Sequence, residues 1–365
     1  MTDSAILLLA HGTPDRLSEM AEYLAKVTGG RPMPQHVVEE LQHRYAEIGL
    51  REEPLPEGPP LTRWTLAQGR LLAELTGQPV YVGMRNWHPY IADTVARMKA
   101  DGVRQAKVLC LAPQNSRTST GLYRRAFEAA AGDSFRYDFI AGWADEPLLI
   151  QAFAERLQPA LATVRARHPQ TPVLFTAHSV PCRTIRAASA SQASEGSAAR
   201  PGAAVPADGI QNYGSASAGD PYPIECKQTA LAVAEHLGLA ESEWMFAFQS
   251  QGVAGAPWLG PPVEDTLRAL AAEGHKAVVM QPIGFLCDHV EILYDIDVNF
   301  RDFGRTLGIE ITRAESLNDS PTLIQALAHV LSSERNAAHE IATPEALNAE
   351  IHTAPLPEPE MAAAG

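Results

Sequence analysis

The sequence predicts an α/β protein built from two similar halves, each with a parallel β-sheet flanked by helices. A repeated phrase is the first sign, because Ala10-His11-Gly12-Thr13-Pro14 and Ala177-His178-Ser179-Val180-Pro181 each follow a short apolar run. The second sign is an even division of eight strand-like runs, four in each half. Amphipathic stretches separate these runs, which is the pattern of βαβ units with parallel sheets.

The strands are predicted from short apolar runs of the length that suits buried strands. In the first half the runs are Ala5–Ala10, Val80–Gly83, Lys107–Ala112 and Phe135–Ile140. In the second half they are Val173–Ala177, Met245–Gln249, Ala277–Pro282 and Glu310–Arg313. The helices predicted between them include Ile91–Ala100, Leu148–Ala162, Gln228–Leu237 and Val263–Ala272.

The two histidines of the repeated phrase come directly after their strands, and a proline stops each strand there. Ligands of open parallel sheets bind at the carboxyl edge of the strands. Two facing halves would therefore present His11 and His178 to one cleft. The alternative is that the two histidines are unrelated polar turn residues.

Composition is that of a soluble globular protein, with 45% hydrophobic and 20% charged residues. The formal charge of −14 disfavours nucleic acid and anionic membranes as partners and suits metal cations or basic ligands. No apolar stretch approaches the roughly 20 residues that a membrane span needs. The N-terminus lacks the basic and apolar regions of a signal peptide. We therefore expect a cytoplasmic protein without a transmembrane segment. The sequence indicates no particular protein partner.

The expected organisation is an N-terminal lobe over residues 1–150 and a C-terminal lobe over residues 151–335. Residues 187–218 are dominated by Ala, Ser and Gly, which predicts a flexible surface insertion of low complexity. Residues 336–365 are rich in Ala, Pro and Glu, which predicts a flexible tail. The cysteines are far apart and form no CxxC pair, so neither a disulfide framework nor a cysteine metal site is indicated.

The segment from Gly284 to Asp295 carries the densest set of reactive side chains. If a helix begins near Asp288, then Asp288, Glu291 and Asp295 fall on one helical face. The spacing of Asp288 and Glu291 also fits a helix-capping box, so a capped, solvated helix without chemistry is the alternative. A row of carboxylates beside His289, at the carboxyl edge of a strand, could pass divalent cations or protons.

Five motifs of the second half occur in a recognisable order. They are Phe175-Thr176-Ala177-His178-Ser179-Val180-Pro181, Gly219-Asp220-Pro221-Tyr222-Pro223, Phe248-Gln249-Ser250, Pro257-Trp258-Leu259-Gly260-Pro261 and Asp288-His289-Val290-Glu291-Ile292-Leu293-Tyr294. Together they resemble the ferrochelatase family, whose members insert ferrous iron into a porphyrin in haem biosynthesis. The resemblance implies a chelatase fold of two Rossmann-like lobes, each with a four-stranded parallel sheet flanked by helices. It also implies a porphyrin held in the cleft between the lobes.

By motif position, the resemblance implies that His178 and Glu291 are the catalytic residues and the residues that meet the metal. Metallation removes two pyrrole N–H protons as a cation enters, so it needs a base near neutrality and a carboxylate route. An imidazole ordinarily titrates near pH 6.5 and, when neutral, can also bind iron. Asp288, His289 and Asp295 would extend this pair as an acidic relay.

The pattern most resembles the Bacillus-type coproporphyrin III ferrochelatases, through Ala10-His11-Gly12-Thr13-Pro14, Gly30-Arg31, Arg44-Tyr45-Ala46-Glu47-Ile48-Gly49 and Tyr123. This likeness implies that the porphyrin binds the following residues: His11, Arg44, Tyr45 and Tyr123. His11 stands where that group has a Tyr that caps the metal, and a histidine can still bind iron. Thr28 and Pro60 replace an anchoring Arg and an anchoring Ser.

Protoporphyrin IX is the alternative substrate, because Pro113-Gln114 and Ser119-Thr120-Gly121 lean toward the protoporphyrin enzymes. Two rival functions are a cobalt or nickel chelatase of a sirohydrochlorin-like macrocycle and a non-catalytic haem carrier. Family members outside the Bacillus type often hold a [2Fe–2S] cluster through cysteines near the C-terminus. This chain has no cysteine after Cys287, so we expect no iron–sulfur cluster and no other cofactor, with Fe²⁺ as a substrate.

Overall fold

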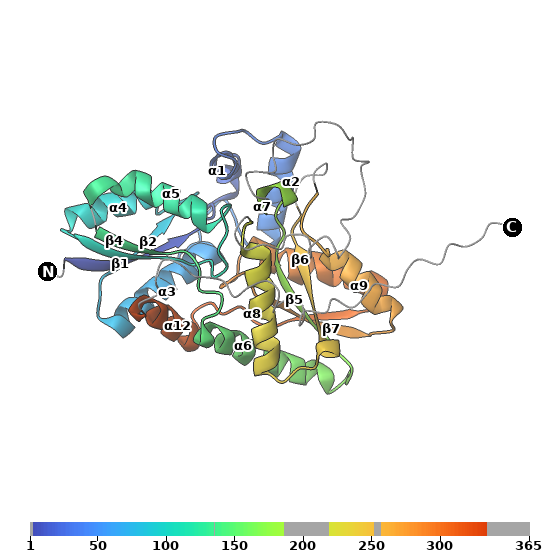
Figure 1. The fold of residues 1–365 in the computed structure, drawn as a ribbon. Coiled ribbons are helices and arrows are strands. Elements are labelled where there is room, and N and C mark those ends of the chain that lie inside the picture. Colours follow the sequence, from blue (N-terminus) through green and yellow to red (C-terminus); the bar gives the residue numbers. More distant parts are fainter. Residues whose placement is uncertain (1–2, 135, 186–218, 252–256, 334–365) are drawn as a thin grey trace, which may run out of the picture.

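The computed structural model describes residues 3–134, 136–185, 219–251 and 257–333. These residues form two four-stranded parallel sheets with flanking helices (Figure 1). The strand order is β2-β1-β3-β4 in the first sheet and β6-β5-β7-β8 in the second. Both halves therefore repeat one topology, and the predicted fold class is confirmed. The predicted insertion at 187–218 and the tail at 336–365 lie outside the described residues.

All eight predicted strands are present, and their ends agree with the predictions to within two residues. The first sheet contains β1 (Ser4–Ala10), β2 (Val80–Met84), β3 (Gln105–Cys110) and β4 (Arg136–Ile140). The second contains β5 (Val173–His178), β6 (Trp244–Gln249), β7 (Ala277–Pro282) and β8 (Glu310–Arg313). The central strands β1 and β5 are almost fully buried, as expected of strands covered on both faces.

Helices cover both faces of each sheet. In the first half they are α1 (Met20–Val27), α2 (Gln35–Glu47), α3 (Pro60–Thr76), α4 (Ile91–Ala100) and α5 (Thr120–Ala131). In the second half they are α6 (Pro147–Arg165), α7 (Cys182–Ile185), α8 (Tyr222–His236), α9 (Val263–Ala272), α10 (Val290–Leu293), α11 (Arg301–Leu307) and α12 (Pro321–Ser332). A π-helical segment, η6 (Asp295–Phe300), joins α10 to α11. Short 3₁₀ turns are η1 (Leu17–Glu19), η2 (Gly132–Ser134) and η5 (Glu241–Glu243).

Helix α8 begins six residues earlier than the predicted start at Gln228, at Tyr222. The prolines Pro221 and Pro223 make this stretch look like a loop in the sequence. Proline is nevertheless tolerated in the first turn of a helix, where no backbone N–H is needed for the helical ladder. The early start brings Tyr222 onto the helix that lies beside β5 and β6.

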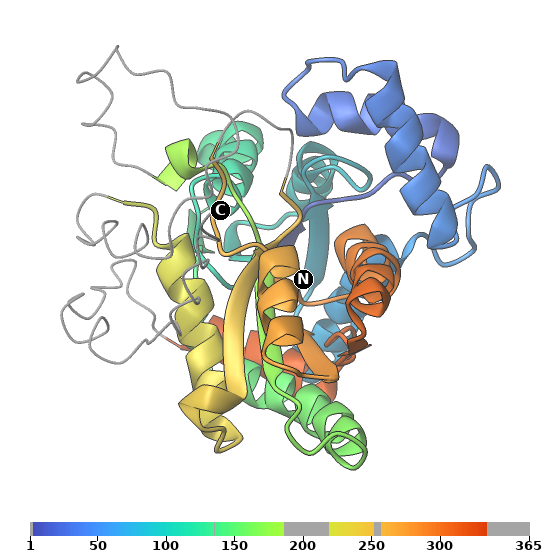
Figure 2. The same cartoon turned by 90° about the vertical axis from the view of Figure 1, so that its right-hand side faces the viewer.

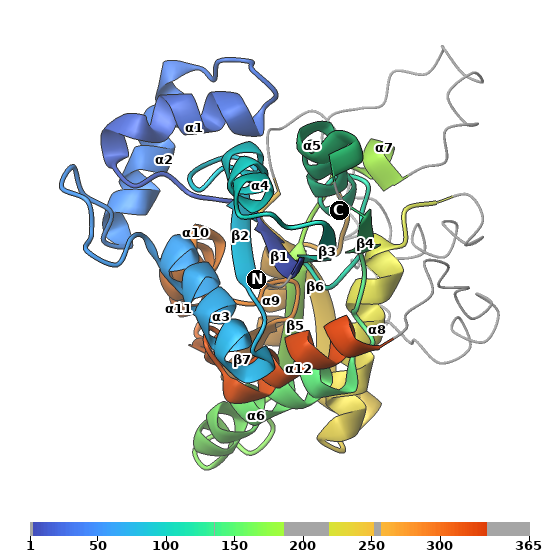
Figure 3. The same cartoon turned by 90° about the vertical axis from the view of Figure 1, so that its left-hand side faces the viewer.

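One apolar cluster is common to both halves, and each half also has an apolar cluster of its own. Helices α4 and α5 cover one face of the first sheet, and α3 and α12 cover the other (Figure 3). Helices α9 and α11 cover one face of the second sheet, and α6 and α8 cover the other (Figure 2). Because α12 packs on both α3 and α6, one apolar cluster runs from Leu8 in the first sheet to Phe175 in the second.

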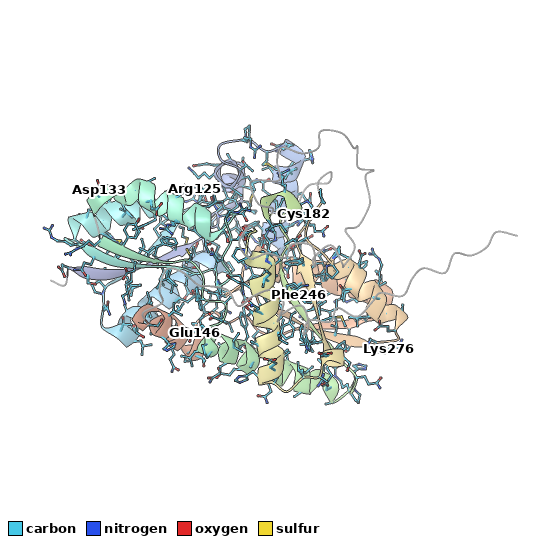
Figure 4. All side chains as sticks on the ribbon, in the orientation of Figure 1. Arg125, Asp133, Glu146, Cys182, Phe246 and Lys276 are labelled. Carbon is cyan, nitrogen blue, oxygen red and sulfur yellow. The ribbon has the colours of Figure 1, made fainter. Side chains whose placement is uncertain are left out.

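Helix α6 spans the predicted lobe boundary between residues 150 and 151. Its N-cap residue, Glu146, is labelled in Figure 4 and is fully buried. The Glu146 carboxylate lies 2.8 Å from Nδ1 of His329 on α12. Within the described ranges, no helix has both the length and the apolar character of a membrane span.

Candidate active site

His178 is the last residue of β5, so it stands at the carboxyl edge of the second sheet. Its carbonyl oxygen accepts a hydrogen bond of 2.8 Å from the Tyr222 hydroxyl at the start of α8. Nδ1 of His178 is buried and has no hydrogen-bond partner among the described residues. The nearest carboxylate is that of Glu291, with 3.9 Å between Nδ1 and Oε2. Nδ1 of His178 thus faces the Glu291 carboxylate and makes no hydrogen bond to any other described residue.

Glu291 lies on the short helix α10, and its side chain is 32% exposed. Its Oε2 atom also lies 3.6 Å from Nε2 of His289. Burial raises the pKa of Glu291, but the charges of His178 and His289 and a hydrogen bond from His289 outweigh burial and bring it to about 2. Glu291 is therefore a carboxylate at every pH at which the protein would work.

Helix α10 begins at Val290, two residues after the expected start near Asp288. Asp288 consequently lies before the helix and does not share a face with Glu291. Its carboxylate accepts hydrogen bonds from Ser316 (2.7 Å) and Asn318 (3.0 Å), and it lies 3.4 Å from the Arg313 guanidinium. These partners come from the end of β8 and the segment after it, which pulls Asp288 away from the Glu291 side chain.

Asp295, the first residue of the π-helical segment, is 7% exposed. Its carboxylate accepts a hydrogen bond from the Ser250 hydroxyl and lies 3.7 Å from the Arg44 guanidinium of α2. Burial raises the pKa of Asp295 to about 6, and the Glu291 charge adds to this effect, against the opposing effects of Ser250 and Arg44. The pKa of Asp295 is therefore higher than that of Glu291, although both groups are carboxyls.

His11 follows β1 on the first sheet and stands across from this group. Its Nε2 atom lies 3.0 Å from the Asn86 side-chain amide, and Nδ1 lies 3.0 Å from the Gly12 carbonyl oxygen and 3.3 Å from the Tyr23 hydroxyl. Burial lowers the pKa of His11, so the ring is neutral at pH 7. Tyr23, whose ring contacts that of His11, belongs to one apolar cluster with Val290 of α10, so the end of β1 lies on the side of the helix that carries Glu291.

The other porphyrin-binding candidates come from two helices of the first half, Arg44 and Tyr45 from α2 and Tyr123 from α5. Arg44 lies over the Tyr294 ring and pairs with Glu40 as well as Asp295. Tyr45 is buried, and its hydroxyl accepts from Thr13 at 3.4 Å. Burial raises the pKa of both Tyr45 and Tyr123, and the Glu291 charge contributes to both shifts.

Sequence reasoning missed Tyr23, Asn86 and Tyr222. Tyr23 contacts His11 and Tyr45, Asn86 holds the His11 ring, and Tyr222 holds the His178 main chain. Tyr222 lies inside one of the five motifs, and Asn86 lies just after the end of β2, so the sequence itself indicated both positions as possible site residues. Tyr23 lies in an ordinary amphipathic helix, and no pattern marked it.

The cysteines are all buried free thiols: Cys110, Cys182, Cys226 and Cys287. Among the described residues, no group of three or more His, Cys, Asp or Glu side chains has an arrangement that could hold a metal ion. The groups that approach the Glu291 carboxylate are the imidazoles of His178 and His289. Chemically, the pair of His178 and Glu291 combines a proton acceptor with a fixed negative charge, and Asp295 adds a second carboxyl with a raised pKa.

The chain has extensive similarity to known proteins. The sequence model of the family described as Ferrochelatase matches residues 3–335. A protein of Acidobacterium capsulatum named Ferrochelatase is 53% identical, with 94% of this chain and 98% of the relative covered. A Ferrochelatase of Herpetosiphon aurantiacus is 37% identical, with 91% and 99% covered. The Coproporphyrin III ferrochelatase of Geobacillus kaustophilus is 32% identical, with 90% and 95% covered.

Proposed function

Because the chain belongs to the ferrochelatase family and is an enzyme that inserts a metal into a porphyrin, we propose that it inserts Fe²⁺ into coproporphyrin III to give coprohaem. The observation that carries the proposal is the unpartnered Nδ1 of His178, 3.9 Å from a Glu291 carboxylate with a pKa of about 2. This pair supplies a base and a permanent negative charge at one sheet edge.

In the proposed reaction, two pyrrole N–H protons leave the macrocycle as Fe²⁺ enters, so the total charge is conserved. Nδ1 of His178 faces Glu291, which leaves Nε2 to accept the two pyrrole protons in turn, with the first passed on before the second is taken. The imidazolium that results is stabilised by the Glu291 carboxylate. The same carboxylate attracts the incoming Fe²⁺, and a neutral imidazole is a suitable ligand for it.

Protons would then leave along the acidic segment. His289 lies beside Glu291, and burial raises the pKa of Asp295 to about 6, so this segment gives the protons a route away from the pair. Asp288 has a different place in this scheme. Its bonds to Ser316, Asn318 and Arg313 fit a role in anchoring the start of α10.

The choice of coproporphyrin III rests on the groups that could hold its four propionates. Arg44 offers a cationic guanidinium, and Tyr45 and Tyr123 offer phenol hydroxyl groups. The Geobacillus relative that bears the substrate in its name supports this choice. His11, with a ring that is neutral at pH 7, would face the macrocycle from the first half. Protoporphyrin IX is the alternative, and the name of the Acidobacterium relative leaves the porphyrin unspecified.

The test is an anaerobic Fe²⁺-insertion assay with coproporphyrin III and protoporphyrin IX at matched concentrations. We expect a higher kcat/KM for coproporphyrin III, because its additional propionates find more cationic and hydroxyl partners. A higher kcat/KM for protoporphyrin IX would contradict the proposed substrate but not the proposed Fe²⁺-insertion activity.

We also propose that the enzyme works without an iron–sulfur cluster and in the cytoplasm. All four cysteines are buried free thiols spread over separate elements, and the acidic composition suits an aqueous compartment. Visible absorption of an iron–sulfur type in purified, porphyrin-free protein would contradict the first point. Recovery of the protein in a washed membrane fraction would contradict the second.

A further inference from the structure

Gln249 occupies a special position next to His178. It is the last residue of β6, and in the parallel pairing of β5 with β6 its Cα is the partner of the His178 Cα. The residue is 1% exposed, although its side chain is polar. A buried carboxamide is costly unless its hydrogen bonds are made, so its partners are informative.

The Gln249 side chain bridges β5 and the helix that carries Glu291. Its Oε1 atom accepts a 2.7 Å hydrogen bond from the Thr176 hydroxyl. Its Nε2 atom donates a 2.7 Å hydrogen bond to the main-chain carbonyl oxygen of Glu291. Thr176 lies two residues before His178 and therefore on the same face of β5. One buried amide thus connects the strand of His178 with the backbone of Glu291.

The backbone of Glu291 needs such support because its helix is short. Helix α10 has four residues, and a π-helical segment follows it. Helices of this length have little stability of their own and depend on tertiary contacts. The residue after Gln249 adds a second attachment, because the Ser250 hydroxyl donates to the Asp295 carboxylate. Ser250 has φ 60°, an unusual value for a residue other than glycine.

We propose that Gln249 is a positioning residue, which sets the distance between the His178 imidazole and the Glu291 carboxylate by holding the Glu291 main chain. This inference rests on the proposed roles of His178 and Glu291. Gln249 does not itself touch the reacting atoms in this scheme. Its loss should therefore lower kcat and leave porphyrin binding close to wild type.

The first test compares Gln249→Met with Gln281→Met. Gln281 is an equally buried glutamine on β7 of the same sheet, and its amide donates to the Pro282 carbonyl oxygen rather than to a site residue. We expect Gln249→Met to lower kcat by about 10²-fold, since a small misplacement of reacting groups can cost that much. Gln281→Met should retain the wild-type kcat. Equal losses in both variants would show that Gln249 is only a core residue.

The second test uses Gln249→Glu, which keeps the shape of the side chain. A protonated carboxyl can donate to the Glu291 carbonyl oxygen, whereas an ionised one would face that oxygen without a proton. The ratio of variant to wild-type kcat should therefore be highest at acidic pH and should fall as the pH rises. A ratio that does not change with pH would overturn the proposal, and this readout remains usable if Gln249→Met fails to fold.

Variants of Glu291 and of Gln249 distinguish a failure of the catalytic pair from a failure of the positioning role. If Glu291→Gln retains full activity, the proposed catalytic pair is wrong, whatever Gln249 does. If Glu291→Gln is inactive and Gln249→Met turns over at the wild-type rate, the catalytic pair of His178 and Glu291 is supported and the positioning role of Gln249 is refuted. Porphyrin affinity, followed by quenching of porphyrin fluorescence, should be unchanged in Gln249→Met. A loss of affinity equal to the loss of kcat would also refute the positioning role.

Discussion

Replacing Glu291 with Gln removes one negative charge and preserves the shape of the side chain. In the proposed mechanism, the carboxylate stabilises the imidazolium that forms when His178 takes a pyrrole proton. For unit charges 3.9 Å apart and an effective dielectric constant of about 20, the attraction is about 4 kcal/mol. Both side chains are about one-third exposed, so solvent screening reduces this value to roughly 2 kcal/mol at the lower limit.

These limits correspond to a loss of kcat between about 30-fold and 10³-fold, at 1.36 kcal/mol for each factor of ten. The assay is initial-rate Fe²⁺ insertion under anaerobic conditions, followed by the absorbance change of the porphyrin. Asp302→Asn is the control, because it removes one charge from an exposed position on the following helix. A Glu291→Gln variant that works at the wild-type rate would show that the carboxylate charge takes no part in the reaction.

Three further predictions concern other parts of the chain. Burial raises the pKa of Glu225 to about 7, so its ionisation destabilises the fold as the pH rises through that value. In urea unfolding, Glu225→Gln should exceed wild type in stability by about 3 kcal/mol near pH 8 and by less than about 1 kcal/mol near pH 5. The exposed Glu235→Gln should show no such difference. Asn86→Ala should free Nε2 of His11 for product iron and shift the haem spectrum toward histidine ligation. An unchanged spectrum would mean that His11 does not reach the iron. Deleting residues 187–218 should preserve the unfolding midpoint and most activity, because loop-closure entropy changes little with length. A lost fold would show that the segment packs.

The strands and the two histidines at their ends could be predicted because their signals are local. A buried parallel strand appears in the sequence as an apolar run, and in both cases here a proline follows the run. His11 and His178 could therefore be placed at the sheet edges from the sequence. The repeated phrase added the relation between the halves. The common strand order of the two sheets confirmed that relation.

The acidic segment could not be predicted to the same depth, because long-range partners decide its shape. Spacing suggested one helical face for Asp288, Glu291 and Asp295. Arg313 and its neighbours after β8 draw Asp288 out of the helix. A π-helical segment then begins at Asp295 and changes the number of residues per turn. No local sequence pattern predicts such a segment.

The hydrogen bonds that position the site residues could not be predicted from the sequence, because they also join residues far apart in the chain. Gln249 is 42 positions from Glu291 along the chain, and Asn86 is 75 positions from His11. Their side chains look like ordinary polar residues at strand ends. Only the folded sheet edge shows that each holds a residue of the site.

In the proposed mechanism, His178 acts on the proton and the metal and contributes little to porphyrin binding. The most direct measurement follows both events with His178→Ala, using porphyrin fluorescence for binding and absorbance for Fe²⁺ insertion in the same sample. We predict coproporphyrin III affinity close to wild type and a loss of insertion rate of about 10² to 10⁴, the usual effect of removing a positioned proton acceptor. Insertion at the wild-type rate would contradict the account.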